Sequence, residues 1–123
     1  MQIPVPLGDV LDKITILRIK SRKISDPGKL AHVRRELEAL QASWDARGFP
    51  TLEQEAGLEA VNEALWDVED HLRRHEAAAD FGAEFVERAR SVYKLNDRRA
   101  ALKRAINEAL GSELVEQKDY VEY

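Results

Sequence analysis

The chain has 123 residues, of which 44% are hydrophobic and 34% charged, the composition of one globular domain rather than of a disordered segment. It contains no cysteine, which excludes disulfide scaffolds, cysteine-zinc sites and thiol catalysis and is typical of a reducing compartment. With a net charge of −4, no signal-like start and no apolar run long enough for a bilayer, we expect a cytoplasmic protein without a membrane span.

Apolar residues at helical spacing, broken only by short turn sequences, predict an all-α fold, an antiparallel bundle of about four helices. The first helix is expected from residue 8 or 9 to 24 and is apolar on several sides, which predicts that neighbouring helices enclose it. The second follows the SDPG turn, where Ser25 or Asp26 can cap and Pro27 suits the first turn, and runs to about residue 47.

The third predicted helix begins after Thr51, which could form a capping box with Gln54, and ends at the AAAD stretch. The fourth runs from about residue 81 to 110, with Gly111 as its stop. At about 30 residues this helix would be roughly 45 Å long, about twice the first helix. The excess must kink, protrude or pack against a second copy, and of these we favour the last, which predicts a homodimer. The two chain ends are expected to be extended, with Val115, Tyr120 and Val121 able to dock on the bundle.

Charge is divided unevenly between the last two helices. Residues 53–80 carry nine acidic and two basic residues, whereas residues 88–104 carry seven basic residues and one acidic. The favoured interpretation is that the two antiparallel helices attract each other within the fold. The alternative, binding of nucleic acid by the basic helix, is not expected because the neutralising acids are adjacent in sequence.

The fourth helix carries polar residues on the face that should be buried. Between Val92 and Ile106, the same-face positions are Asn96, Arg99 and Lys103. A buried cation must be paired, and possible partners are the acids of the third helix, Glu63, Asp67 and Asp70, or Asp12 of the first. Three interpretations stay open: a structural ion network, a pocket for an anionic or polar ligand, and a surface for a protein partner. The candidate ligand-binding residues are Asn96, Arg99, Lys103, Asp12 and Asp67.

Trp66 lies outside the apolar seam of the third helix, in a polar stripe with Asn62, Glu69 and Arg73. A large aromatic residue in such a stripe either covers the edge of a bundle or anchors an interface. Both interpretations stay open from the sequence.

Catalytic and metal-binding patterns are not evident. His71 and His75 share a helix face with Asp67 one turn earlier, but no further ligand lies nearby in sequence, and no Glu-x-x-His pair of a di-iron site occurs. There is no Ser-His-Asp set and no glycine-rich phosphate loop. We therefore expect no metal, no cofactor and no catalytic residues.

Four strings together cover nearly the whole chain: GDVLDKITILRIK, VNEALWDVED, FVERARSVYKLNDRRAALKRAIN and GSELVEQKDY. As a set they resemble a small bacterial family of unknown function, the DUF6165 type. The resemblance implies a compact helical protein with no assigned activity, sometimes encoded near glycosyltransferase or surface-polysaccharide genes. The motif positions that carry over are Asp12, Lys13, Asn62, Trp66, Asp67, Asn96, Asp97, Arg98 and Arg99. Among them, the candidate interface residues are Trp66, Asn62, Asp97 and Arg98.

Two functions follow from these observations as expectations. The first is a non-catalytic interaction or adaptor protein, linked to surface-polysaccharide biosynthesis and engaging a protein partner such as a glycosyltransferase. The second is a binding protein or enzyme for a small anionic metabolite, a sugar phosphate or carboxylate, held by Arg99, Lys103 and Asn96. A looser analogy to helical chorismate mutases, which also hold an anion between helices, lacks a matching arginine set.

Overall fold

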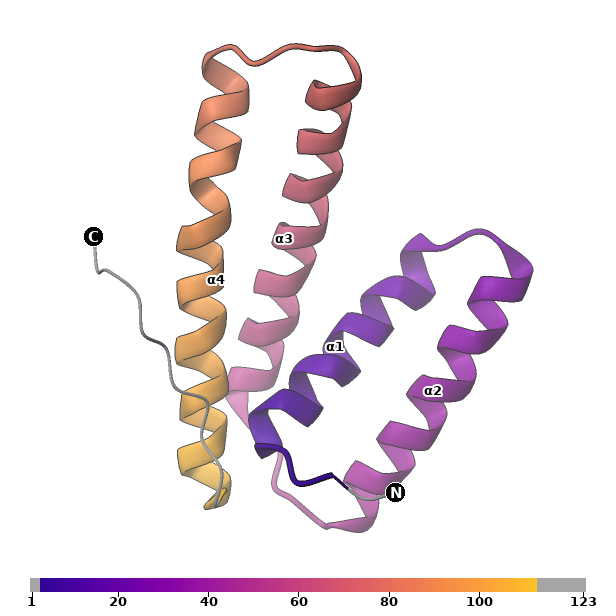
Figure 1. The fold of residues 1–123 in the computed structure, drawn as a ribbon. Coiled ribbons are helices and arrows are strands. Elements are labelled where there is room, and N and C mark those ends of the chain that lie inside the picture. Colours follow the sequence, from indigo (N-terminus) through magenta and orange to yellow (C-terminus); the bar gives the residue numbers. More distant parts are fainter. Residues whose placement is uncertain (1–2, 113–123) are drawn as a thin grey trace.

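The computed structural model describes residues 3–112 and contains four α-helices: α1 (Leu7–Lys23), α2 (Pro27–Ala46), α3 (Glu53–Ala77) and α4 (Ala83–Leu110) (Figure 1). No strand occurs in this part of the chain, so the all-α prediction is confirmed, with helix ends within a few residues of those expected. The predicted docking of Val115, Tyr120 and Val121 falls outside the described residues.

The helix ends mostly follow the predicted turn chemistry. Asp26 caps α2 by accepting a hydrogen bond from the Lys29 amide at 2.9 Å, and Pro27 occupies the first turn. Gly111 ends α4 in the left-handed conformation, φ 66°, which glycine adopts without steric strain. The capping box expected at Thr51 is not formed, because α3 begins with Leu52 as its N-cap and no side-chain cap.

The helices form two antiparallel hairpins, α1–α2 and α3–α4, and α1 connects them (Figure 1). α1 packs against all three other helices, whereas the backbone of α2 approaches only α1. This central position explains why α1 is apolar on several sides: it must bury one face on α2 and another on the α3–α4 hairpin.

The core lies where α1 crosses α3 and α4. Leu11, Leu58 and Ile106, from three different helices, are at most 1% exposed and form one cluster, against which Trp44 of α2 also packs. Further buried side chains come mainly from α1, and none of the α2 residues is fully buried. Each buried Leu or Ile contributes about 1.5–3 kcal/mol, and α1 supplies four of the eight buried hydrophobic side chains of the described residues, more than any other helix.

The α3–α4 hairpin is longer than the helix that covers it. The last ion pair from α1 reaches Asp67, and α3 continues to Ala77. The rest of the hairpin, here called the arm, extends beyond α1 (Figure 1), and its tip is closed by the buried His75 against Phe85. None of the described helices combines the length and the apolar character that crossing a bilayer requires.

Candidate functional site

The polar centre of α4 is paired mainly with α1. Arg99 forms a two-pronged ion pair with Asp12: Nε lies 2.9 Å from Oδ1 and Nη2 lies 2.5 Å from Oδ2. The Asp12 side chain is 7% exposed and that of Arg99 30%. A carboxylate this deeply buried needs such a partner, because unpaired burial of a charge costs several kcal/mol.

Two further residues complete the surroundings of Asp12. The Asn62 side-chain amide of α3 donates hydrogen bonds to Asp12 Oδ1 and to Thr15 Oγ, both at 2.9 Å. The Thr15 hydroxyl donates in turn to the Asp12 carbonyl at 2.8 Å. Asp12, Thr15, Asn62 and Arg99 therefore form one network that joins α1, α3 and α4, here called the Asp12 network.

The N-terminus of α1 is held by the C-terminal end of α4. Asn107 accepts a hydrogen bond from the Gly8 amide at 2.6 Å, which supplies the cap that Pro6 does not provide. Lys103 lies next to this contact, with Nζ 2.9 Å from Asp9 Oδ1. The two helices approach so closely that a Cβ built on Gly8 would lie 2.5 Å from the Lys103 carbonyl oxygen.

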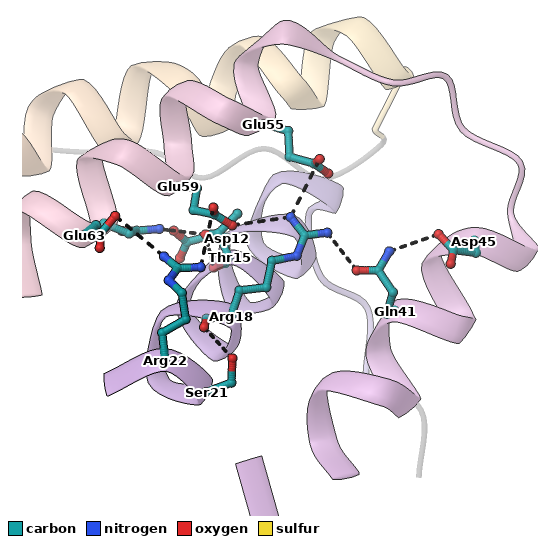
Figure 2. Close-up of polar contacts among 11 residues, drawn as sticks. Asp12, Thr15, Arg18, Ser21, Arg22, Gln41, Asp45, Glu55, Glu59 and Glu63 are labelled. Atoms are coloured by element: carbon teal, nitrogen blue, oxygen red, sulfur yellow. Dashed lines mark hydrogen bonds and ion pairs between the residues drawn. The ribbon is translucent and has the colours of Figure 1, made fainter. Parts of the chain in front are cut away.

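The sequence predicted that the acids of α3 neutralise the basic residues of α4, and this prediction is wrong. These acids pair with the basic C-terminal half of α1, because α1 runs alongside α3 in the same direction (Figures 1 and 2). The pairs advance together along both helices: Arg18 with Glu55 and Glu59, Arg22 with Glu59 and Glu63, Lys23 with Glu63 and Asp67. Asp70 pairs within its own helix, with Arg74.

Arg18 also connects this row of ion pairs between α1 and α3 to α2. Its Nη2 donates to Gln41 Oε1 at 2.8 Å, and the Gln41 amide donates to Asp45 at 3.0 Å (Figure 2). Arg18 and Trp44 are among the residues that line a cavity of about 210 Å³ beneath the α2–α3 connection. The charged groups in this cavity already have partners, since Arg18 pairs with Glu55 and Asp45 accepts from Gln41, which is typical of a structural network.

A second cavity lies directly beside the Asp12 network. It has a volume of about 240 Å³ and is lined from α1, α3 and α4 by Ile16, Ile19, Lys20, Asn62, Leu65, Trp66, Glu69, Asn96 and Arg99. We call it the Trp66 pocket. It combines an indole, two amides, two cations and one carboxylate over an apolar floor in which Ile19 is 1% exposed.

The predicted site residues divide into two groups. Asp12, Asn62, Trp66, Asn96 and Arg99 come together in the Asp12 network and the Trp66 pocket. The remaining candidates lie elsewhere: Lys103 beside Asp9, Asp67 exposed beside Lys23, and Asp97 and Arg98 on the outer side of α4.

Sequence reasoning did not identify Thr15 or Lys20 as site residues. Thr15 stands in an apolar run, where its buried hydroxyl is a polar group in need of a partner, a signal that could have marked it. Lys20 looked like an ordinary surface lysine. No group of three or more His, Asp or Glu residues within the described chain is arranged to hold a metal ion.

The model of the family of unknown function DUF6165 matches residues 1–122. The chain belongs to this family. The resemblance noted in the sequence is thus confirmed, and the DUF6165 match extends over the Asp12 network and the Trp66 pocket. Comparison with curated proteins and with solved structures found no match.

Proposed function

We propose that this protein binds a small sugar phosphate in the Trp66 pocket, with the sugar ring against Trp66 and the phosphate towards Lys20 and Arg99. The observation that carries this proposal is that residues far apart in the sequence line one cavity. Two helices, α3 with Asn62 and Trp66 and α4 with Asn96 and Arg99, bring these side chains to one cavity, although they come from two separate family-type strings. The third helix, α1, completes the lining. A structural network alone needs no aromatic wall and no open volume beside it.

The pocket is held in shape before any ligand enters. Arg99 is fixed by its two bonds to Asp12, and Asn62 is fixed by Asp12 and Thr15. Side chains fixed in this way lose little conformational freedom on binding, which favours affinity for a small ligand. The Asp12 network therefore supports both the fold and the pocket.

The charges and the size limit the ligand. Asp12 neutralises Arg99, and the remaining charged side chains of the pocket, Lys20 and Glu69, balance each other. A large polyanion does not fit a nearly neutral cavity of about 240 Å³, which lies slightly below the usual range for ligand pockets of about 300–1,000 Å³. A monosaccharide carrying one phosphate matches both limits: its ring presents an apolar face to an indole, its hydroxyls suit Asn62 and Asn96, and Lys20 meets the phosphate.

The lining supports binding more than covalent catalysis. Among the described residues that line the pocket there is no Ser, Thr, Cys or His. Nucleophilic catalysis commonly relies on one of these beside a base. A carrier, sensor or regulatory subunit fits this set of side chains.

The test is a titration with three probes: glucose 1-phosphate, glucose and inorganic phosphate. Binding is followed by Trp66 fluorescence in a Trp44→Phe background, since the chain has two tryptophans. We expect glucose 1-phosphate to bind more tightly than either fragment. Asn96→Ala should weaken binding about tenfold, and Lys20→Ala should do so only for the phosphorylated probes.

Arg98→Ala is the matched control, because Arg98 is exposed on α4 and does not line the pocket. It should leave the affinity unchanged. No fluorescence change with any probe at millimolar concentration, or equal effects of Asn96→Ala and Arg98→Ala, would overturn the proposal. Tighter binding of glucose than of its phosphate would instead point to a neutral sugar and refute the assigned role of Lys20.

The interaction-protein function rests on a different feature, the outer side of α4, where the half-buried Asp97 and the exposed Arg98 lie. That surface supports a protein contact and does not exclude the pocket. The proposed connection to surface-polysaccharide biosynthesis, through a partner such as a glycosyltransferase, is the reason for beginning the ligand tests with sugar phosphates.

A further inference from the structure

The outer side of α4 carries side chains in the three-four spacing that helices use to pack against one another. Val86, Arg90, Tyr93, Asp97 and Arg104 follow this spacing along one side of the helix. We call this the α4 outer face. Val86 is 50% exposed and Tyr93 42% exposed, and both lie towards the arm, where α1 does not cover α4.

Two charged residues of this face, Asp97 and Arg104, have no polar partner within the described part of the fold. The side chains of Asp97 and Arg104 make no hydrogen bond or ion pair to any described residue, in contrast to Arg99 and Lys103 on the inner side of the same helix. Arg90 is exposed and hydrogen-bonded to Tyr93, one turn further on, which raises the pKa of its guanidinium. The face thus offers an exposed cation, an exposed aromatic ring and a half-buried carboxylate in a row.

We infer that the α4 outer face is the contact between two copies of this chain, packed antiparallel about a two-fold axis between Tyr93 and Lys94. Such an axis places Arg90 of each copy opposite Asp97 of the other and Val86 opposite Ala101. Only a self-complementary surface can form a two-fold contact, and one cation and one anion equidistant from the axis are self-complementary. The inference does not depend on the Trp66 pocket.

The shape of the monomer supports a second copy as the occupant. The arm consists of two helices packed on each other alone, and a two-helix unit buries little apolar surface. About this axis, residues 83–93 of α4 in one copy lie along residues 94–104 of α4 in the other, which covers Val86 and Tyr93 and gives each arm a further helix to pack against. Because the α4 outer face lies on the opposite side of the helix from Arg99 and Lys103, which pair with α1, the dimer leaves the Asp12 network untouched.

Charge reversal tests the contact. Sedimentation velocity at micromolar concentration should show a dimer for the unmodified chain. Arg90→Asp and Asp97→Arg should each raise the dimer dissociation constant about tenfold or more, since each change sets like charges opposite each other twice. The double variant Arg90→Asp/Asp97→Arg should restore dimerisation.

Arg34→Asp, an equal charge change on the exposed side of α2, is the control and should leave the dimer intact. A second measurement is disulfide cross-linking, which is possible because the chain has no cysteine of its own. Tyr93→Cys, close to the axis, should form a disulfide-linked dimer on mild oxidation, and Ala39→Cys on α2 should not. A monomeric unmodified chain, a dimer insensitive to Arg90→Asp, or failure of the double variant to recover would each overturn the inference.

Discussion

Removal of the Arg99 guanidinium tests how far the fold depends on the Asp12 network. Arg99→Ala leaves the Asp12 carboxylate, 7% exposed, with Asn62 as its one remaining side-chain donor among the described residues. Breaking a fully buried ion pair costs about 3–5 kcal/mol. Because the Arg99 side chain is 30% exposed, water replaces part of the lost interaction, and we expect a loss of about 2–4 kcal/mol.

The assay is urea unfolding followed by circular dichroism, with Lys13→Ala as the matched control. Lys13 is the next residue on α1 and pairs with Glu36 at the same 2.9 Å distance, but both side chains are about half exposed, 59% and 47%. An exposed pair contributes about 0–1 kcal/mol, so Lys13→Ala should change stability very little. Both substitutions remove one cation that is paired with one carboxylate, so the comparison shows what the burial and two-pronged geometry of the Arg99 pair add.

A double-mutant cycle gives the refuting result. Asp12→Ala should also be destabilising, but Asp12→Ala/Arg99→Ala should lose less than the sum of the two single variants, with a coupling of about 1–3 kcal/mol. Additive losses, or a loss below about 1 kcal/mol for Arg99→Ala, would refute the reasoning that the buried pair holds α1 on α4. Because this substitution disturbs the fold, Asn96→Ala and Lys20→Ala are the better probes of ligand binding.

Two small residues should respond in opposite directions. Gly8→Ala places a methyl group 2.5 Å from the Lys103 carbonyl and 2.9 Å from Asn107 Oδ1, so α1 must shift, and we expect a loss of about 1–3 kcal/mol in the unfolding free energy. Gly28→Ala is the control, since its nearest atom lies at 3.5 Å, and it should be neutral or slightly stabilising. Ala79→Gly should increase the unfolding free energy by up to about 1 kcal/mol and raise the thermal midpoint, because Ala79 adopts φ 52° in the α3–α4 turn. An unchanged or lower midpoint would contradict this.

Local chemistry made the helices predictable. The three-four spacing of apolar residues located all four, and Pro27 and Gly111 marked ends that the structure confirms. These features act within a few residues along the chain, so they do not depend on which helix becomes the neighbour. The start of α3 was less clear, because Thr51 has the right side chain but does not occupy the cap.

The site was predictable only in part. Asn96 and Arg99 could be predicted as site residues because a polar group on an apolar stripe needs a partner, and that requirement can be read from the sequence. The partner itself could not be read from it. The acids of α3 and Asp12 of α1 were equally able to pair with Arg99, and the acids of α3 instead pair with Arg18, Arg22 and Lys23.

The sequence by itself thus determined the helical class, the positions of the helices and the need to neutralise a polar patch on α4. Only the tertiary structure decided that α1 lies between the two hairpins, that Asp12 meets Arg99 across 87 positions of sequence, and that Trp66 opens onto a pocket beside them. The physical reason is that the apolar stripes of the four helices have the same spacing, so any of them could pack together. The long charged side chains could likewise reach several different partners. The close approach of α1 to α4 at Gly8 and the two-pronged ion pair between Asp12 and Arg99 both require one particular packing of the helices. Neither contact exists until that packing has formed.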